Sequence, residues 1–276
     1  MSYLERAKGL DRLTSPLQRA ARLLPQGRVR DALYGVWLGH PLHPALVQLP
    51  VGTWMSASVL DAWPGNEVAS RRLVLTGLAA SVPAAVAGTA DWSEQHEQQM
   101  RVGVVHILAN VAALGLYAAS VPVSGRAAKG LRLAGLAAAG TGAYIGGHIA
   151  YRQAAGANQA EAVPHLVEPG WQDLMPLAEV NALPEANPAK RTLGDVPVVV
   201  VRADGDVTVL ADQCAHLSGP LSEGDCHDGL LTCPWHGSTF RLADGSVAHG
   251  PATAPQPVFR TRISGGTLQV CLEGAG

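Results

Sequence analysis

Two cysteine–histidine pairs stand close together in the C-terminal part of the chain. Cys214 and His216 form the first pair, and Cys233 and His236 form the second. A 2Fe–2S cluster with two thiolates on one iron and two imidazoles on the other needs one cysteine and one histidine from each of two loops. The order of the pairs meets this need, so the sequence predicts a cluster held by these four side chains.

Structural zinc is the alternative occupant of such a set of ligands. Zinc fingers usually present a cysteine pair followed by a histidine pair on a helix. Residues 217–232, which lie between the two pairs, show no helical periodicity. The pattern therefore favours an iron–sulfur cluster over zinc.

Residues 171–273 resemble Rieske ferredoxins and the related small domains of bacterial electron-transfer chains, most clearly in the run CPWHGSTF at residues 233–240. The resemblance implies an all-β sandwich with both cluster loops at one end. It implies that the two cysteines hold the inner iron and the two histidines the outer iron. It also implies that the proline-rich segment 250–257 is a third loop, which shields the cluster from water.

The chain departs from one branch of this family in ways that affect the reduction potential. Rieske proteins of cytochrome bc complexes join the two loops by a disulfide, and the corresponding positions here are Gly219 and Trp235. Those proteins also use a tyrosine where this chain has Phe240, although the family's serine is retained as Ser238. With one hydrogen-bond donor fewer, the reduced cluster is stabilised less. We expect a potential in the lower part of the range of about −150 to +300 mV.

Charge and hydropathy divide the 276-residue chain into two unlike parts. Residues 1–170 are rich in alanine, leucine, valine and glycine and are mildly basic, whereas residues 171–276 are acidic. The acidic part and the lack of a recognisable motif argue against a nucleic-acid partner. We expect a basic amphipathic segment at 1–31, a four-helix membrane domain at 32–152, a linker at 153–170 and a Rieske domain at 171–276.

Four apolar stretches, at residues 44–60, 73–90, 102–121 and 133–150, contain no Asp, Glu, Lys or Arg. Each is close to the roughly 20 residues that a helix needs to cross a bilayer. They predict an all-α four-helix transmembrane bundle, and the basic N-terminal tail favours a cytoplasmic location for both termini. The amphipathic segment before the bundle lies either on the membrane surface or against the chain's own domain. The linker after it reads as a tether.

A second resemblance covers residues 39–153. The motif HPLHP at residues 40–44, His106 with Asn110, and Gly147 with His148 resemble the markers of an uncharacterised family of four-span bacterial membrane proteins, sometimes fused to a Rieske domain. This resemblance implies a membrane location and brings no established activity.

Several ionisable side chains fall at similar depth near one face of the expected bundle: His43, Asp91, His106 and His148. Such groups are costly at membrane depth and often mark ion, proton or cofactor sites. They either form a second site, which binds haem, a metal ion or a quinone head group, or they cap helices at the membrane interface.

These patterns predict a membrane-anchored protein that transfers electrons between a membrane redox partner, quinone or haem, and a protein partner. Two alternatives stay open: a sensor of iron or oxidant whose cluster need not turn over, and an electron-supplying component of an oxygenase. A terminal oxygenase is disfavoured because its mononuclear iron needs two histidines and a carboxylate, and His249 is the sole histidine after His236.

Overall fold

The computed structural model describes residues 2–203 and 205–272. Contacts between Cα atoms divide the chain into two compact units. The helical unit contains the residues up to Gln26 and Pro41–Ala155, and the β unit contains Gly27–His40 and the residues from Gly156 onward. Each unit is therefore built from two separate stretches of sequence.

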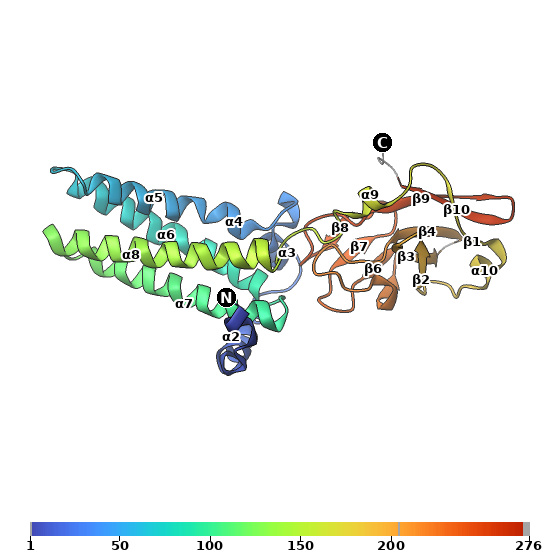
Figure 1. Cartoon of the computed structure of the whole chain (residues 1–276), viewed down its shortest axis with the longest axis horizontal. Helices are drawn as coiled ribbons and strands as arrows, with labels where there is room; N and C mark the ends of the chain where they lie inside the picture. Colours follow the sequence, from blue (N-terminus) through green and yellow to red (C-terminus); the bar gives the residue numbers. More distant parts are fainter. Residues whose placement is uncertain (1, 204, 273–276) are drawn as a thin grey trace. The chain divides into compact units, whose positions relative to one another are not determined.

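Long helices run side by side in the helical unit (Figure 1). Trp54 stacks on Tyr117, with ring centroids 4.4 Å apart and an angle of 16° between the planes. Gly77 leaves no room for a side chain against Trp54, and this lets the helices approach closely. The main helices are α5 (Gln48–Leu60), α6 (Glu67–Trp92), α7 (Glu97–Ser120) and α8 (Gly125–Gly147), with the short α4 (Leu42–Leu46) before them and the π-helix η3 (His148–Arg152) after them.

The apolar stretches expected to cross a membrane all lie in these helices. In the described part of the chain, α6 and α7 are long and apolar enough to span a bilayer by length and composition. The first stretch is divided between α4 and α5 at Val47. Pro50 explains this break, because it has no N–H to donate to the carbonyl of Leu46 one turn earlier.

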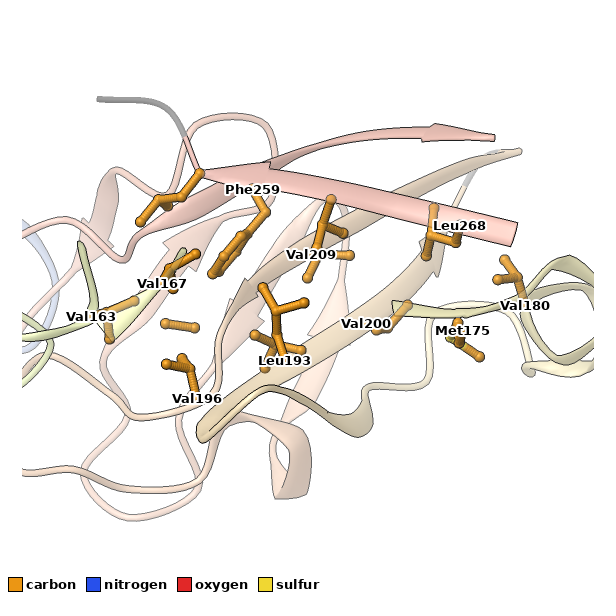
Figure 2. Packing of buried hydrophobic residues seen from close by; sticks show 14 of the residues in the cluster. Val163, Val167, Met175, Val180, Leu193, Val196, Val200, Val209, Phe259 and Leu268 are labelled. Carbon is orange, nitrogen blue, oxygen red and sulfur yellow. The ribbon is translucent and has the colours of Figure 1, made fainter. Parts of the chain in front are cut away.

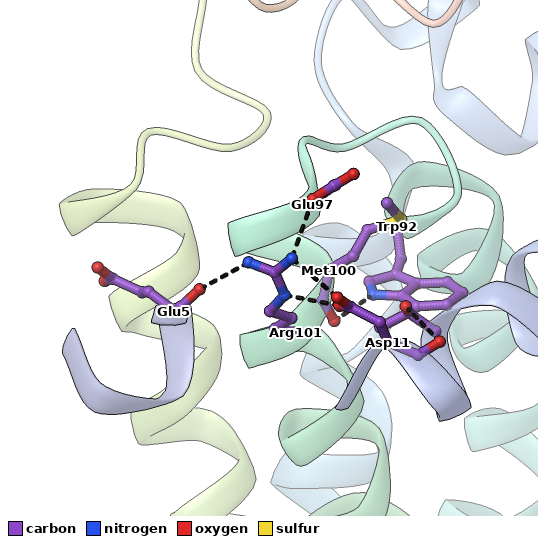
Figure 3. A network of polar contacts seen from close by, with 7 residues as sticks. Glu5, Asp11, Trp92, Glu97, Met100 and Arg101 are labelled. Atoms are coloured by element: carbon purple, nitrogen blue, oxygen red, sulfur yellow. Dashed lines mark hydrogen bonds and ion pairs between the residues drawn. The ribbon is translucent and has the colours of Figure 1, made fainter. Parts of the chain in front are cut away.

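The N-terminal segment packs against the chain's own helical unit. It forms α1 (Ser2–Arg6), the 3-10 helix η1 (Lys8–Leu10) and α2 (Asp11–Ala21). Arg101 of α7 is buried beneath it and donates to both carboxylate oxygens of Asp11, at 2.6 and 3.0 Å (Figure 3). The same guanidinium donates to the carbonyl of Glu5, at 3.1 Å, and to the carboxylate of Glu97, at 2.9 Å. Packing on the chain's own domain, one of the two arrangements left open by the sequence, is present in the structure.

Two antiparallel sheets form the β unit within the described residues. The larger sheet has the strand order β1-β10-β9-β4-β3-β2, and the smaller has the order β5-β6-β7-β8. The larger sheet contains β1 (Gln172–Pro176), β2 (Ala189–Leu193), β3 (Val196–Ala203), β4 (Asp206–Ala211), β9 (Val258–Ser264) and β10 (Thr267–Leu272). The smaller contains β5 (Asp225–His227), β6 (Leu230–Thr232), β7 (Thr239–Arg241) and β8 (Val247–His249).

Strand β3 separates two hydrophobic cores. Val198 and Val200 point into one core with Phe259 (Figure 2), whereas Val199 and Val201 point into the other, which contains the cysteines of both pairs. Successive side chains of a strand point to opposite faces, so a strand buried on both faces reads as a continuous apolar run. The valine-rich sequence of β3 meets this requirement.

The segment that the sequence presents as a tether packs onto the β unit over much of its length. Val163, at the start of α9 (Val163–Leu166), and Val167 belong to the core shown in Figure 2. Ala160 belongs to the second core, and the amide of Gln159 donates to the carbonyl of Ala215 at 2.9 Å. Residues 159–167 are therefore part of the β unit rather than a free linker.

Candidate iron–sulfur site

The two cysteine–histidine pairs lie on loops that share one backbone turn. In the first loop, the amide of Cys214 donates to the carbonyl of Gly219 at 2.9 Å, and its carbonyl accepts from the amide of Ser218 at 2.9 Å. In the second loop, Cys233 makes the equivalent bonds with Ser238, at 2.8 Å, and Gly237, at 3.1 Å. Ser218 and Gly237, at matching places in the two turns, both have positive φ. These hydrogen bonds fix the backbone around each cysteine, and the two loops bring their histidine rings together.

This arrangement groups like side chains with like. Cys214 and Cys233 are 1% and 3% exposed and share a hydrogen bond between their thiols. His216 and His236 are only partly buried, and their rings meet edge to face with centroids 5.1 Å apart. The site therefore has a buried pair of sulfurs and a partly exposed pair of imidazoles.

Hydrogen-bond donors surround the sulfurs. The amides of Trp235 and His236 donate to the sulfur of Cys233, and the amide of His216 and the hydroxyl of Ser238 donate to that of Cys214. The bond from Cys214 lowers the pKa of Cys233 to about 7. The same bond, together with burial, raises the pKa of Cys214. The hydrogen bond therefore favours the thiolate form of Cys233, and the thiolate is the form of cysteine that binds metals.

A third loop closes over the first two. The amide of Ala252 donates to Ser238 Oγ at 2.9 Å, so the hydroxyl that reaches Cys214 also supports this loop. Gln256, 2% exposed, accepts from the amide of Ala215 at 3.1 Å. Its amide group donates to the carbonyls of Ala211 and Gln213, at 2.8 and 2.7 Å.

Gln256 is a site residue that the sequence analysis does not single out. One sequence feature could have indicated its role: Gln256 is a long polar side chain between Pro255 and Pro257, in a proline-rich segment expected to cover the cluster. A buried glutamine in such a place must satisfy its own amide and serves to tie loops together.

The donor set fits the ligand requirements of a mixed 2Fe–2S cluster. A 2Fe–2S centre of the mixed type asks for two cysteines at one iron and two histidines at the other. The paired thiols and the paired imidazoles supply these, and the sulfurs already receive the hydrogen bonds that such a centre uses.

Comparison with known proteins agrees with this chemistry. Residues 171–260 match the family model of the Rieske [2Fe-2S] domain. The ferredoxin subunit of anthranilate 1,2-dioxygenase from Burkholderia cepacia is 33% identical over 95 residues, which are 34% of this chain and 88% of that protein. The chain belongs to the Rieske [2Fe-2S] family.

Other relatives of this Rieske protein are also oxygenase ferredoxins. The ferredoxin component of biphenyl 2,3-dioxygenase from Rhodococcus jostii is 31% identical over 81 residues, 29% of this chain and 76% of that protein. A chain in the solved complex of reduced oxygenase and oxidized ferredoxin in carbazole 1,9a-dioxygenase is 25% identical, with a TM-score of 0.33, and the match covers 37% of this chain and 92% of that one. Family membership supports a 2Fe–2S cluster and a role in electron transfer.

The N-terminal part of the Rieske protein matches a second family. Residues 39–160 match the model described as a predicted membrane protein, DUF2231. The same chain thus joins a predicted membrane domain to a Rieske domain, as the two sequence resemblances imply.

The structure brings together only part of the second set of residues expected in the membrane domain. His43 and His106 lie with ring centroids 6.3 Å apart. Each Nδ1 donates to a helix carbonyl at 2.8 Å, His43 to Ala84 and His106 to Gly142. His148 instead donates to the carboxylate of Glu5 at 3.0 Å. Asp91, near the end of α6, completes no group of metal ligands with these histidines in the described part of the chain.

Proposed function

We propose that this Rieske protein is a membrane-anchored electron carrier that connects a membrane redox partner, quinone or haem, with a protein partner. One observation carries the proposal: the two imidazoles lie on the partly exposed side of a buried pair of cysteines. An electron carrier needs a route of this kind, because its metal centre must be shielded from water yet lie close to a partner. The cluster would supply one-electron chemistry when bound.

In this proposal, Cys214 and Cys233 hold one iron as thiolates, and His216 and His236 hold the other through one ring nitrogen each. Ser238 and the loop amides donate to the sulfurs and stabilise the added negative charge of the reduced state. Phe240, fully buried beside the cysteines, has no hydroxyl to add a further donor. The potential should therefore lie in the lower part of the Rieske range.

The ligand assignment can be tested on the full-length protein purified from membranes. Wild-type protein should contain iron and acid-labile sulfide and give a Rieske EPR signal after reduction. His216→Ser and His236→Ser should each abolish that signal, whereas the matched change His227→Ser, at an exposed histidine of β5, should leave it intact. Wild-type protein that contains zinc and no acid-labile sulfide would refute the proposal.

We further propose that four segments cross the membrane and that both termini are cytoplasmic. The lengths of α6, α7 and α8 and the pairing of α4 with α5 support this number of spans. An even number of spans places both termini on one side, and the basic residues of the N-terminal segment favour the cytoplasm. Protease added outside intact cells should leave the Rieske domain whole. Ready cleavage there would reverse the orientation.

We also propose a second redox site, in the membrane domain. The approach of His43 to His106 supports it, because a neutral histidine whose Nδ1 donates to a carbonyl keeps Nε2 unprotonated and able to accept a proton or a ligand. In His106 this nitrogen lies 3.2 Å from the side-chain amide of Asn110, which an occupant would have to displace. A quinone head group or a haem is the expected occupant. His43→Ala and His106→Ala should slow quinol-dependent reduction of the cluster, or remove the haem absorbance of purified protein. If both variants behave as wild type and no haem is present, the membrane domain acts only as an anchor.

Supply of electrons to an oxygenase is the second candidate function, and the similarity to oxygenase ferredoxins favours it. The two candidates differ in the direction of electron flow. If the cluster is reduced by a soluble reductase and reoxidised by an oxygenase while quinone has no effect, the second candidate is correct. A cluster that changes state without turnover by any partner would instead indicate a sensor.

A further inference from the structure

Helix α3 (Arg28–Tyr34) comes before the membrane domain in sequence but packs within the β unit, next to the loop that covers the cluster site. Asp31 makes the central contact. One carboxylate oxygen accepts from His249 Nδ1 at 3.0 Å, and the other accepts from the amide of Gly250 at 2.9 Å. A single carboxylate thus holds His249, the last residue of β8, and Gly250, the first residue of the covering loop, defined here as residues 250–257.

Tyr34 adds a steric contact from the same helix. Its side chain is buried, and its ring lies over Gly250 so closely that a Cβ at that glycine would lie 2.5 Å from the ring. Asp31 and Tyr34, one helical turn apart, therefore face the loop together. The carboxylate of Asp31 is needed for the hydrogen bonds, and a glycine is needed at position 250 because a larger residue would clash with Tyr34.

From Gly250 a short series of contacts leads to the metal-binding side chains. Two residues further along the loop, the amide of Ala252 is held by Ser238 Oγ, which donates to the sulfur of Cys214. At the far end of the loop, Gln256 holds the amide of Ala215, beside the same cysteine. The covering loop is thus fastened to the cluster loops at two points and to α3 at its start.

We infer that Asp31 and Tyr34 are positioning residues for the iron–sulfur site: they hold the covering loop in place from outside the loop cluster. This inference rests on the proposed function, since it assigns the two residues a role toward the cluster. Asp31 acts through His249 and Gly250, and Tyr34 acts through Gly250, so the observed contacts of both residues reach the site by way of the loop. We call the contacts of Asp31 and Tyr34 with the covering loop the clamp. When the clamp is lost, water gains access to the cluster, stabilises the more negative reduced state and raises the reduction potential.

Asp31→Ala and Asp31→Asn separate positioning from charge. Both remove a negative charge from the region, but Asp31→Asn keeps an oxygen that can accept from Gly250. In full-length protein, we expect Asp31→Ala to raise the midpoint potential, to alter the EPR line shape and to speed loss of the cluster to a chelator several-fold. Asp31→Asn should stay close to wild type. Equal shifts in both variants would assign the effect to charge and overturn the inference, as would no shift in either.

Gly250→Ala tests the steric contact, because the new methyl group must push Tyr34 away. The double variant Gly250→Ala with Tyr34→Ala relieves this clash, so it should lose its cluster to a chelator more slowly than Gly250→Ala alone. Asp195→Ala, at an exposed carboxylate in the turn between β2 and β3, is the control and should match wild type. Failure of the double variant to differ from the single one would remove Tyr34 from the clamp.

Hydrogen exchange gives a readout that does not depend on the cluster. Asp31→Ala should speed exchange of the amides in residues 249–256 several-fold relative to Asp195→Ala. If wild-type protein has no 2Fe–2S cluster, the proposed function fails but this comparison still decides whether α3 clamps the loop. Unchanged exchange in Asp31→Ala would reject the clamp even if the cluster is present.

Discussion

Gly219 lies directly against Cys233: a Cβ at this glycine would be 2.8 Å from the cysteine sulfur and 3.1 Å from the ring of Trp235. The distance to the sulfur is shorter than a Cβ can sustain, and the distance to the ring is tight, so a side chain here would have to displace part of the second cluster loop. Gly219→Ala should therefore displace the Cys233 sulfur and reduce the iron and acid-labile sulfide content of purified protein several-fold. Gly115→Ala, with open space around it in α7, is the control and should keep full content. A fully loaded Gly219→Ala protein would show that the loops adapt.

Gln256→Leu should destabilise the Rieske domain without touching a metal ligand. The substitution leaves the amide of Ala215 and the carbonyls of Ala211 and Gln213 without their partner in a buried place. Each unsatisfied buried group costs about 1–3 kcal/mol, so we expect a loss of about 2–4 kcal/mol, allowing for partial relaxation. Denaturant unfolding of the full-length protein, followed by visible circular dichroism of the cluster, measures it. Gln269→Leu, which removes only exposed hydrogen bonds, should cost much less.

Arg132→Met should destabilise the helical unit. Arg132 and Asp61 form an ion pair, with 2.7 Å between Nη1 of the arginine and Oδ1 of the aspartate, and their side chains are 5% and 9% exposed. Removing one member of a buried pair leaves an uncompensated charge, which typically costs about 3–5 kcal/mol. Thermal unfolding in detergent, followed by the helical signal, should show this loss. The double variant with Asp61→Asn should recover part of it, and a single variant as stable as wild type would contradict the prediction.

Acid should release the N-terminal segment from α7. The hydrogen bond from Arg101 holds the pKa of Asp11 below its ordinary value of 3.8. A lowered folded-state pKa contributes stability that is present above pH 3.8 and is lost as the pH falls through the folded-state value. Protection of residues 2–21 from a protease active in acid should therefore hold at pH 5 and fall away below about pH 3.8. Asp11→Ala should abolish the pH dependence by exposing the segment at pH 5 as well.

The proposed cluster ligands can be picked out from the sequence because each pair is close together in the chain. Each pair occupies one short loop, so spacing alone places Cys214 beside His216 and Cys233 beside His236. The valine run of β3 is equally direct, since burial on both faces leaves a continuous apolar signature.

Contacts between distant segments carry no such signal. Asp31 lies in a helix of seven residues, and nothing in its sequence neighbourhood indicates a partner 218 residues away. Residues 159–167 resemble a tether because they contain a proline and show little periodicity, yet Val163 and Ala160 each belong to one of the two cores. Gln256 is hidden for a similar reason, because its three bonds depend on loops that meet only in the folded state.

The position of a histidine along a membrane span is not enough to predict which residues it contacts. Equal depth along the spans does not fix the direction in which a side chain points around its helix. His43 and His106 face each other, but His148 faces Glu5 on the N-terminal segment, which the span pattern does not place.

The β unit is divided into two stretches of sequence, and most of the helical unit lies between them in the chain. Asp31 leaves the ribosome 218 residues before His249, a delay of roughly 10 to 40 s at 5–20 residues per second. During that interval His249 and Gly250, the residues that Asp31 contacts, have not been made, and the helices from α4 to α8 are synthesised first. The larger sheet can close only when β9 and β10 are made, so we expect the cluster site to form after these strands. A fragment that begins at residue 156, the natural choice for a soluble version, would lack Asp31 and Tyr34 and leave Gly250 uncovered.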